Sequence, residues 1–206
     1  MSVIALVGAV GVGKTYFGRM LKSIDPSIIF IEEDTSKNVF LNEFYSDMQK
    51  WGFHSRISMM SMVLSNTIES IGKEKKGEIV LLDRCIEELI VFATKEYEDK
   101  NLTEKEFTLY YQLYLDLLKV LPRPDIFVYF RCNPQISFQR IKQRGRECEQ
   151  NIDLDFCNDI ISRYDNWRNS LVDCNVVDVN SDNGIDPNRI WEDITIKLEE
   201  RRQNNG

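Results

Sequence analysis

The chain has 206 residues, of which 43% are hydrophobic and 29% are charged, and its formal net charge is −7. This length and apolar content suffice for the core of one globular domain, so we expect a single domain over residues 1–206. The acidic balance argues against a nucleic-acid partner, because phosphate backbones are bound through an excess of Lys and Arg. A small anionic ligand can still meet a local basic patch.

Cysteine usage and hydropathy bear on the cellular compartment. The five cysteines are odd in number and lack C-x-x-C spacing, so neither a disulfide framework nor a zinc cluster is indicated. No apolar stretch reaches the roughly 18 residues of a membrane-spanning helix, and the N-terminus has no basic leader. We expect a cytoplasmic protein without a membrane partner.

The first predicted element is a strand over residues 2–7, SVIALV, and a glycine-rich segment follows it. Residues 8–15, GAVGVGKT, match the phosphate-binding pattern G-x-x-x-x-G-K-[S/T] at every fixed position. The glycines at 8, 11 and 13 let backbone N–H groups converge on an anion, and the next helix adds the positive end of its dipole. An ordinary strand-turn-helix connection is the alternative, and the buried strand pattern before the loop disfavours it.

The last two residues of this motif carry its chemistry. Lys14 is expected to neutralise charge on the β- and γ-phosphates, and Thr15 to offer its hydroxyl to magnesium. The chain is therefore predicted to bind a nucleoside triphosphate.

Four more strand-like runs follow, with helical patterns between them. The runs cover residues 27–32, 78–82, 125–130 and 175–179. Two long helical regions, 47–72 and 86–121, carry apolar residues at three- and four-residue spacing. Within the second, Thr103 and Glu106 have the spacing of a capping box. This alternation predicts an α/β fold with a five-stranded, mainly parallel sheet and helices on both faces, and the long helices imply a second helix layer or a dimer interface.

Charged residues follow the second and third strands, at the edge where parallel sheets bind ligands. Glu32 and Glu33 end the second strand, and Asp83 and Arg84 follow the third. A single charge at a strand end often marks only the emergence of the chain into water. An acid–arginine pair beside a phosphate loop favours function, because Asp can hold magnesium and Arg can stabilise transferring charge.

A basic segment, RIKQRGRECEQ, follows the fourth strand and its helix. It brings Arg140, Arg144 and Arg146 close together around Gly145. Such a run usually marks a solvated helix face. Next to a phosphate loop it predicts an arginine-rich lid over about residues 140–152 that closes on the phosphates.

In this order, the motifs resemble the deoxyribonucleoside kinases, the family of the deoxycytidine, deoxyguanosine and bacterial deoxyadenosine kinases. The resemblance covers nearly the whole chain and rests on the phosphate loop, FIEED, FLNEFYSDMQKWGF, LLDRC and RIKQRGRECEQNIDLDF. It implies a P-loop kinase fold and ATP- and magnesium-dependent phosphorylation of the 5′-hydroxyl of a deoxyribonucleoside. It also implies a homodimer joined through the long helices.

The resemblance further implies roles for the residues at the strand ends. Glu32 looks like the carboxylate that accepts the proton of the sugar 5′-hydroxyl. Glu33 stands where members usually have proline, so the assignment of the general base can shift by one position. Asp83 resembles the magnesium-binding acid and Arg84 the arginine that steadies the base and the transferring phosphoryl. The catalytic residues are therefore expected to be Glu32, Arg84 and Lys14, with Thr15 and Asp83 on the metal.

The remaining site residues follow in the same way. The residues expected to bind ATP are Gly8, Gly11, Gly13, Lys14, Thr15, Arg140, Arg144 and Arg146. Tyr45 and Glu149 match the pair that hydrogen-bonds the deoxyribose 3′-hydroxyl, and Glu88 joins them and Arg84 as a substrate-binding residue. Residues 176–183 resemble the loop against which adenine rests. Tyr110 is expected to serve packing rather than recognition.

Arg56 departs from the family pattern W-x-F-x-x-Q, in which the glutamine reads the nucleobase edge. A guanidinium donates hydrogen bonds and accepts none, so it cannot accept from the exocyclic amine of adenine or cytosine. Arg56 then reads an acceptor-rich edge, as in guanine or thymine, or holds the phosphate of a monophosphate substrate, or turns to solvent or pairs with Glu87 or Glu88. The first interpretation predicts poor use of deoxyadenosine and deoxycytidine.

Two other functions remain open at this stage. A thymidylate-like monophosphate kinase shares the phosphate loop, the Asp–Arg pair and the arginine lid. A non-catalytic nucleotide-binding subunit would keep the fold without turnover, and the presence of Glu32, Asp83 and Arg84 argues against it.

Overall fold

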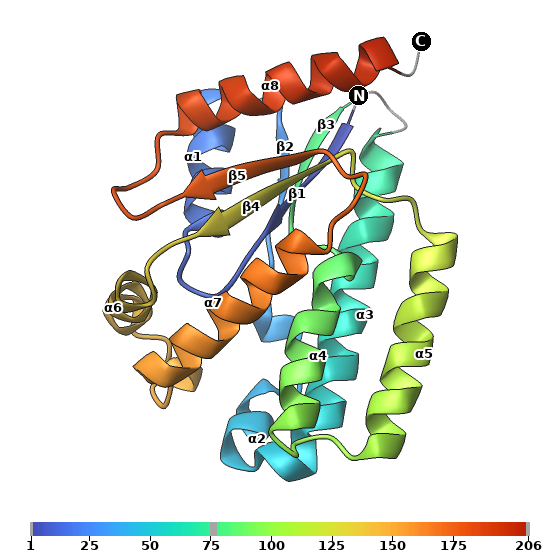
Figure 1. The fold of residues 1–206 in the computed structure, drawn as a ribbon, viewed down its shortest axis with the longest axis vertical. Coiled ribbons are helices and arrows are strands. Elements are labelled where there is room, and N and C mark those ends of the chain that lie inside the picture. Colours follow the sequence, from blue (N-terminus) through green and yellow to red (C-terminus); the bar gives the residue numbers. More distant parts are fainter. Residues whose placement is uncertain (1, 75–77, 205–206) are drawn as a thin grey trace.

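The computed structural model describes residues 2–74 and 78–204 (Figure 1). Five parallel strands form one sheet in the order β2-β3-β1-β4-β5. The strands are β1 (Ser2–Val7), β2 (Ile29–Ile31), β3 (Ile79–Asp83), β4 (Ile126–Arg131) and β5 (Val176–Asn180). The predicted parallel sheet is confirmed. Because β1 lies at its centre, the loop after β1 opens at the middle of the carboxyl edge, where doubly wound sheets bind their ligands.

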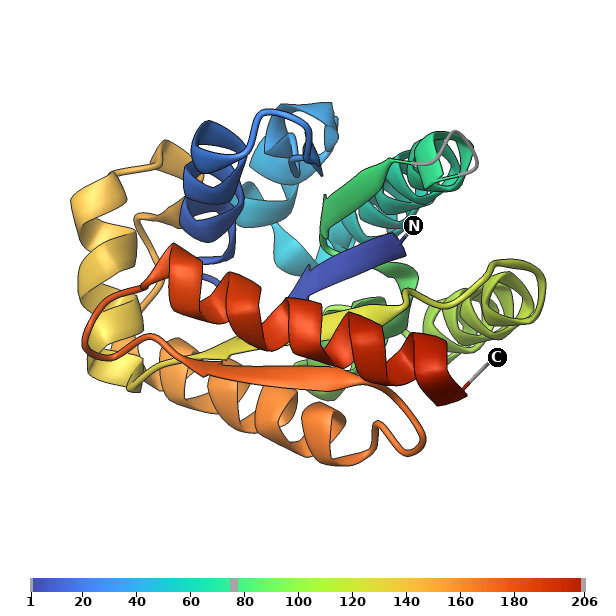
Figure 2. The same cartoon turned by 90° about the horizontal axis from the view of Figure 1, so that it is seen from above.

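Helices cover both faces of the sheet (Figures 1 and 2). On one face α1 (Lys14–Ile24) packs beside α8 (Pro187–Asn204). On the other lie α3 (Met48–Glu74), α4 (Leu89–Glu98) and α7 (Leu154–Asn169). The short α2 (Leu41–Ser46) and the helix α6 (Pro134–Arg144) stand near the carboxyl edge, and three 3₁₀ turns, η1 (Thr35–Lys37), η2 (Ile86–Glu88) and η3 (Glu147–Glu149), link these elements.

A second helix layer forms where α5 (Glu104–Val120) packs on α3 and α4, away from the sheet (Figure 1). Met60, Val63, Ile86 and Tyr110 are among the buried residues of a core between these helices, separate from the main core around the sheet. The predicted second layer is thus confirmed.

The helix that forms this layer begins where the sequence indicates. The Thr103 hydroxyl accepts from the backbone N–H of Glu106, and the Glu106 carboxylate accepts from the N–H of Thr103. This reciprocal cap satisfies two donors that the first turn would otherwise leave unpaired. The predicted capping box is confirmed.

Two predicted boundaries differ from the structure in ways that affect the site. The region 86–121 is not one helix, because η2 precedes α4 and a cap starts α5. The second strand was expected over residues 27–32, but β2 is an edge strand that pairs with β3 over only Ile29, Phe30 and Ile31. Glu32 and Glu33 therefore lie in the loop after β2, outside the regular alternation of the strand, and their side chains have different surroundings.

Within the described ranges, the helices include none that combines the length and the apolar character needed to cross a membrane. Among the described side chains, Cys85, Cys132, Cys157 and Cys174 carry free thiols.

Candidate active site

The glycine-rich loop joins β1 to α1 in a conformation that side chains would obstruct. Gly8 has φ +134° and Gly13 has φ +103°, a region that L-residues rarely adopt. A Cβ on Gly8 would lie 2.3 Å from the carbonyl oxygen of Phe130, and one on Gly13 would lie 2.5 Å from Cδ1 of Ile185. The glycines therefore allow β4 and the loop after β5 to approach the phosphate loop. The helix that starts at Lys14 directs its positive end into the same space.

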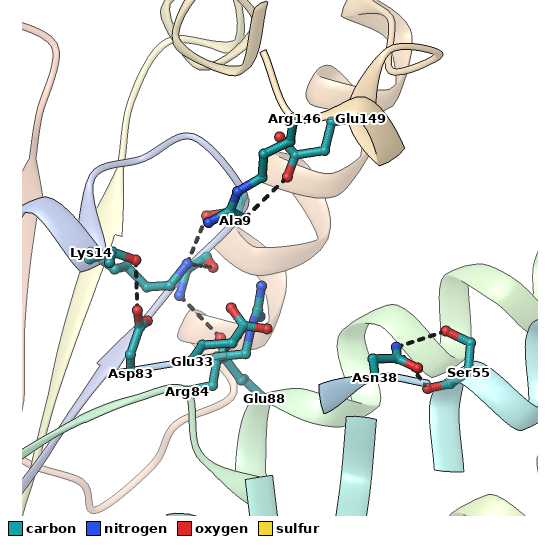
Figure 3. A network of polar contacts seen from close by, with 12 residues as sticks. Ala9, Lys14, Glu33, Asn38, Ser55, Asp83, Arg84, Glu88, Arg146 and Glu149 are labelled. Carbon is teal, nitrogen blue, oxygen red and sulfur yellow. Dashed lines mark hydrogen bonds and ion pairs between the residues drawn. The ribbon is translucent and has the colours of Figure 1, made fainter. Parts of the chain in front are cut away.

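Lys14 lies in the polar floor of the site, close to Asp83 (Figure 3). Lys14 is buried, and its Nζ donates to the carbonyl oxygens of Gly8 at 2.7 Å and Ala9 at 2.9 Å. Burial lowers the pKa of Lys14, and the charge of Arg84 lowers it further. A lysine tied to the loop in this way is positioned to meet an anion rather than solvent.

The buried Asp83 offers the chemistry of a divalent cation site. Its Oδ2 accepts from the hydroxyl of Thr15 at 2.7 Å, while its buried Oδ1 has no hydrogen-bond partner among the described residues. Burial raises the pKa of Asp83, although Lys14 opposes the rise. A carboxylate oxygen without a partner, next to a hydroxyl and a phosphate loop, fits a hard cation such as Mg²⁺ that takes one or two protein oxygens. The predicted metal pair Thr15 and Asp83 is thus brought together.

Glu33, Arg84 and Glu88 gather beside this floor (Figure 3). Glu33 comes from the loop after β2, and Arg84 and Glu88 come from the connection between β3 and α4. Arg84 Nε lies 2.8 Å from Glu33 Oε1 as an ion pair, without the alignment of a hydrogen bond. Arg84 Nη1 donates to the hydroxyl of Tyr164 at 3.2 Å and lies 3.5 Å from Glu88 Oε1. The other oxygen of Glu88 accepts from the N–H of Gly8 at 3.1 Å. The arginine is therefore held by partners on several sides.

The ion pair sets the charge of Glu33. Burial raises the pKa of Glu33, but the charges of Arg84 and Lys14 outweigh burial and leave the pKa below its ordinary value. The Glu33 carboxylate is thus ionised beside the phosphate loop at neutral pH.

Glu32 lies elsewhere, contrary to its expected place in the site. Its carboxylate pairs with Arg19 of α1, which donates from Nε at 2.9 Å, and 34% of the Glu32 side chain is exposed. Glu33, and not Glu32, is among the residues that line the main cavity of the described chain. The placement shifts by one residue because β2 ends at Ile31 and consecutive side chains diverge beyond it.

That cavity has a volume of about 730 Å³ and extends from the phosphate loop to the layer of α3, α4 and α5. At the loop end it is lined by Gly11, Gly13, Lys14, Thr15, Arg140, Arg144 and Arg146. Away from the loop it is lined by Tyr45, Arg56, Met59, Leu89, Phe92 and Tyr110. Glu88, which contacts Gly8, and Glu149, which pairs with the lid arginines, also line it. The polar end suits the phosphates of a donor nucleotide, and the largely apolar end suits the flat nucleobase of an acceptor.

The lid arginines lie at the loop end, each with protein partners. Arg140 donates to the backbone oxygen of Ser181 at 2.6 Å and to its hydroxyl at 2.9 Å, so it holds the loop after β5 against the phosphate loop. Arg144 pairs with Glu149 through two nitrogens, and Arg146 lies 3.5 Å from the same carboxylate. Glu149 therefore links the lid arginines to the cavity that Tyr45 also lines.

Arg56 also lies inside the cavity, which excludes one of its three interpretations. It is 7% exposed, and no ion pair joins it to Glu87, Glu88 or any other acid within residues 2–74 and 78–204. The alternatives of a solvent-facing or ion-paired Arg56 are therefore wrong. The substrate-facing interpretations remain.

Sequence reasoning missed the apolar half of the cavity. Met59, Leu89 and Phe92 line it from α3 and α4, and Tyr110, expected to serve packing alone, is both buried and part of the lining. On the sequence these residues differ in no way from other apolar positions of amphipathic helices. Glu33 had a signal, its place next to Glu32 at a strand end.

A central parallel strand, a glycine loop with a buried lysine, and an acid held by the loop threonine define the class of P-loop kinases. The family model for deoxynucleoside kinases matches residues 4–200, and the chain belongs to that family. As a member, it is an enzyme that phosphorylates deoxynucleosides.

Relatives of several base preferences match this chain. It is 27% identical over 200 residues to a deoxyadenosine kinase of Dictyostelium discoideum, covering 97% of this chain and 80% of the relative. It is 26% identical to the deoxyadenosine/deoxycytidine kinase of Bacillus subtilis, over 85% of this chain and 81% of the relative. It is 29% identical to the deoxyguanosine kinase of the same bacterium, over 79% of this chain and 76% of the relative.

Among solved structures, the deoxyadenosine kinase from M. mycoides with dCMP and dCDP bound has a TM-score of 0.78 to this chain. It is 24% identical, and the match covers 96% of this chain and 99% of that one. At this identity the likeness concerns the fold. The relatives are named for different deoxynucleosides. Family membership therefore does not determine which nucleobase this chain prefers, and the residues of its own cavity must be considered.

Proposed function

We propose that this enzyme transfers the γ-phosphoryl group of ATP to the 5′-hydroxyl of a deoxyribonucleoside, with Glu33 as the general base. One observation carries the proposal: an ionised carboxylate, with its side chain 13% exposed, lies 2.8 Å from Arg84 and lines the cavity beside the phosphate loop. A base must lie within hydrogen-bond reach of the proton that it removes and must be deprotonated at the working pH. Glu33 is ionised and lines the cavity that would receive the 5′-hydroxyl. Glu32 instead pairs with Arg19 and is not among the residues that line the cavity.

At the donor end, the backbone of residues 8–15 cradles the phosphates, and Lys14 neutralises the charge on their oxygens. Thr15 and Asp83 would hold Mg²⁺, which supplies charge stabilisation on the β- and γ-oxygens when bound. The lid residues Arg140, Arg144 and Arg146 add positive charge around the same group and exclude water as the segment closes. Water exclusion matters because water is a smaller nucleophile of the same kind as the 5′-hydroxyl.

At the acceptor end, Glu33 takes the 5′-hydroxyl proton as the oxygen attacks the γ-phosphorus, and the bond from that phosphorus to the β,γ-bridging oxygen breaks to release ADP. Arg84 lies between Glu33 and Glu88, where it can orient the base and stabilise the charge that develops on the moving phosphoryl. Tyr45 and Glu149 line the cavity on the lid side, where we place the deoxyribose 3′-hydroxyl. The apolar cavity wall formed by α3, α4 and α5 receives the nucleobase.

The two alternative functions fit the site less well. A monophosphate acceptor would bring phosphate charge to the 5′ position beside the ionised Glu33, and that repulsion disfavours a thymidylate-like kinase. A non-catalytic subunit has no need of a carboxylate held at the phosphate loop by a buried arginine.

An assay that couples ADP release to an indicator, run with the four deoxynucleosides and then with their monophosphates, tests the proposal. Turnover is expected with nucleosides. Turnover with monophosphates alone would favour the thymidylate-like alternative, and ATP binding without either turnover would favour the non-catalytic subunit.

We also propose that the enzyme is a homodimer joined through its long helices. Ile68 of α3 and Leu109, Leu113 and Val120 of α5 are apolar side chains left exposed on the outer helices. Burial of such side chains in a second copy would remove apolar surface from water.

A further inference from the structure

Arg56 is a buried cation in the acceptor half of the cavity, and no ion pair joins it to an acid among the described side chains. It is 7% exposed, and its Nε has no hydrogen-bond partner among the described residues. Its guanidinium carbon lies 5.4 Å from the ring centre of Phe44 and 5.5 Å from that of Phe92. The aromatic faces stabilise the charge in part, but they satisfy none of the five N–H donors.

The surroundings of Arg56 show which partner it needs. Phe44 and Phe92 offer no acceptor other than their rings. Tyr110 of α5 lies close to Arg56. Burial raises the pKa of the Tyr110 phenol, and the charge of Arg56 opposes that rise. The cavity carboxylates are engaged elsewhere, Glu33 and Glu88 with Arg84 and Glu149 with the lid arginines. A ligand group beside Arg56 must therefore supply acceptors, because the guanidinium supplies only donors.

Phe92 places Arg56 relative to the reacting atoms. The Arg84 guanidinium lies 5.6 Å from the centre of the same ring that Arg56 contacts, so the phenyl ring joins the two cations. The 5′-oxygen belongs at the Arg84 end, beside Glu33. A phosphate on that oxygen would meet Arg84 first, so Arg56 is poorly placed to hold it. The base, at the other end of the nucleoside, is the part that reaches Arg56.

Resting on the proposed function, we propose that Arg56 makes this enzyme select 6-oxopurine deoxynucleosides by donating two hydrogen bonds to O6 and N7 of the base. Guanine and hypoxanthine present these two acceptors side by side, and the guanidinium fork matches that pair. Adenine replaces O6 by an amine, which would oppose N–H to N–H in a buried place. Cytosine presents an amine on the corresponding edge, and thymine lacks a second acceptor next to O4.

The first test compares substrates that differ in one acceptor, using the unaltered enzyme. Deoxyinosine and deoxyadenosine differ in the group at position 6, and we expect kcat/KM to favour deoxyinosine about tenfold or more. Deoxyguanosine and 7-deaza-2′-deoxyguanosine differ only at N7, and we expect the deaza compound to lose about tenfold in kcat/KM. Equal use of either pair, or a preference for thymidine, overturns the assignment.

The second test exchanges the residue. Arg56→Gln supplies one acceptor and should shift the deoxyinosine-to-deoxyadenosine ratio of kcat/KM toward deoxyadenosine by about tenfold or more. Arg168→Gln is the matched control, because Arg168 pairs with Asp178 on β5, away from the cavity, and its ratio should equal that of the unaltered enzyme. An unchanged ratio in Arg56→Gln overturns the proposal.

Failure of the proposed function gives a different result. If monophosphates turn over and nucleosides do not, the reaction proposed above is wrong. If nothing turns over, calorimetric affinities of the unaltered protein for deoxyinosine and deoxyadenosine decide the inference, since the preference of Arg56 for an acceptor edge acts on binding. Equal affinities would overturn it.

Discussion

Replacement of Glu33 by glutamine tests whether its carboxylate accepts the proton of the 5′-hydroxyl. The change keeps the shape of the side chain and removes its charge and its ability to accept a proton. A general base contributes about 10²- to 10⁴-fold, which is about 3–5.5 kcal/mol in the activation barrier. We expect kcat to fall by that factor, while ATP affinity stays near that of the unaltered enzyme because the loop and Lys14 are untouched.

The same change also affects the fold, and the structure indicates by how much. Arg84 would keep only Glu88, at 3.5 Å, as an ion-pair partner. Loss of one partner of a buried ion pair costs about 3–5 kcal/mol, which for a chain of this size lowers Tm by roughly 6–20 °C. The assay is therefore run at 25 °C, with circular dichroism to establish that the variant is folded.

Glu32→Gln is the matched control, since it makes the same chemical change one residue away. Its ion pair with Arg19 is solvent-accessible on both sides, and such pairs contribute at most about 1 kcal/mol to stability. ADP release by Glu32→Gln should match that of the unaltered enzyme. If Glu32→Gln abolishes turnover and Glu33→Gln leaves it intact, the assignment of the base to Glu33 is refuted.

The pH profile gives a second readout of the same group. Burial raises the pKa of Glu33 and the charges of Arg84 and Lys14 lower it, with a net position below the ordinary 4.5. A base must be deprotonated to act, so activity is lost only as pH falls through that lowered pKa. We expect Glu33 to contribute no loss of kcat/KM between about pH 7 and about pH 5, so that any acid limb there comes from other groups and persists in Glu33→Gln. An acid limb near pH 6 that is absent from Glu33→Gln would contradict this.

Two further predictions follow from the metal pair and the helix layer. Asp83→Asn should raise the Mg²⁺ concentration needed for half-maximal turnover, because an amide oxygen binds a hard cation less strongly than a carboxylate; a Mg²⁺ titration identical to that of the unaltered enzyme would reject the role. Light scattering at micromolar concentration should give the mass of two chains, and a mass of one 24.2 kDa chain would contradict the homodimer.

The donor half of the site could be predicted from sequence because its parts are contiguous. Residues 8–15 form one loop whose glycines are required by backbone geometry, and the Gly8 and Gly13 φ angles bear this out. Asp83 and Arg84 directly follow a buried strand, so strand alternation alone places them at the carboxyl edge. Local rules suffice where function depends on a single turn of chain.

The acceptor half depends on where elements end and on how helices pack against one another. The choice between Glu32 and Glu33 rests on the last residue of the edge strand β2, and strand ends are uncertain from sequence by more than one residue. The cavity wall of Met59, Phe92 and Tyr110 comes from three helices, and the apolar pattern of each helix is satisfied by packing whether or not a cavity lies between them. No local signal distinguishes these positions.

Glu88 shows how the two halves are joined, and why its role was difficult to predict. It was expected to bind substrate, and it does line the cavity. In the structure one of its oxygens accepts from the N–H of Gly8 in the phosphate loop, and the other lies 3.5 Å from Arg84 Nη1. Burial raises the pKa of Glu88, and the charge of Arg84 works against that rise.

A fully buried carboxylate between a backbone donor and a cation is stable only if both partners stay in place. The position of the phosphate loop and the orientation of Arg84 are therefore linked through one side chain that is 80 residues distant from the loop in sequence. Because Arg84 in turn pairs with Glu33, direct contacts connect the donor loop to the carboxylate that we propose as the general base.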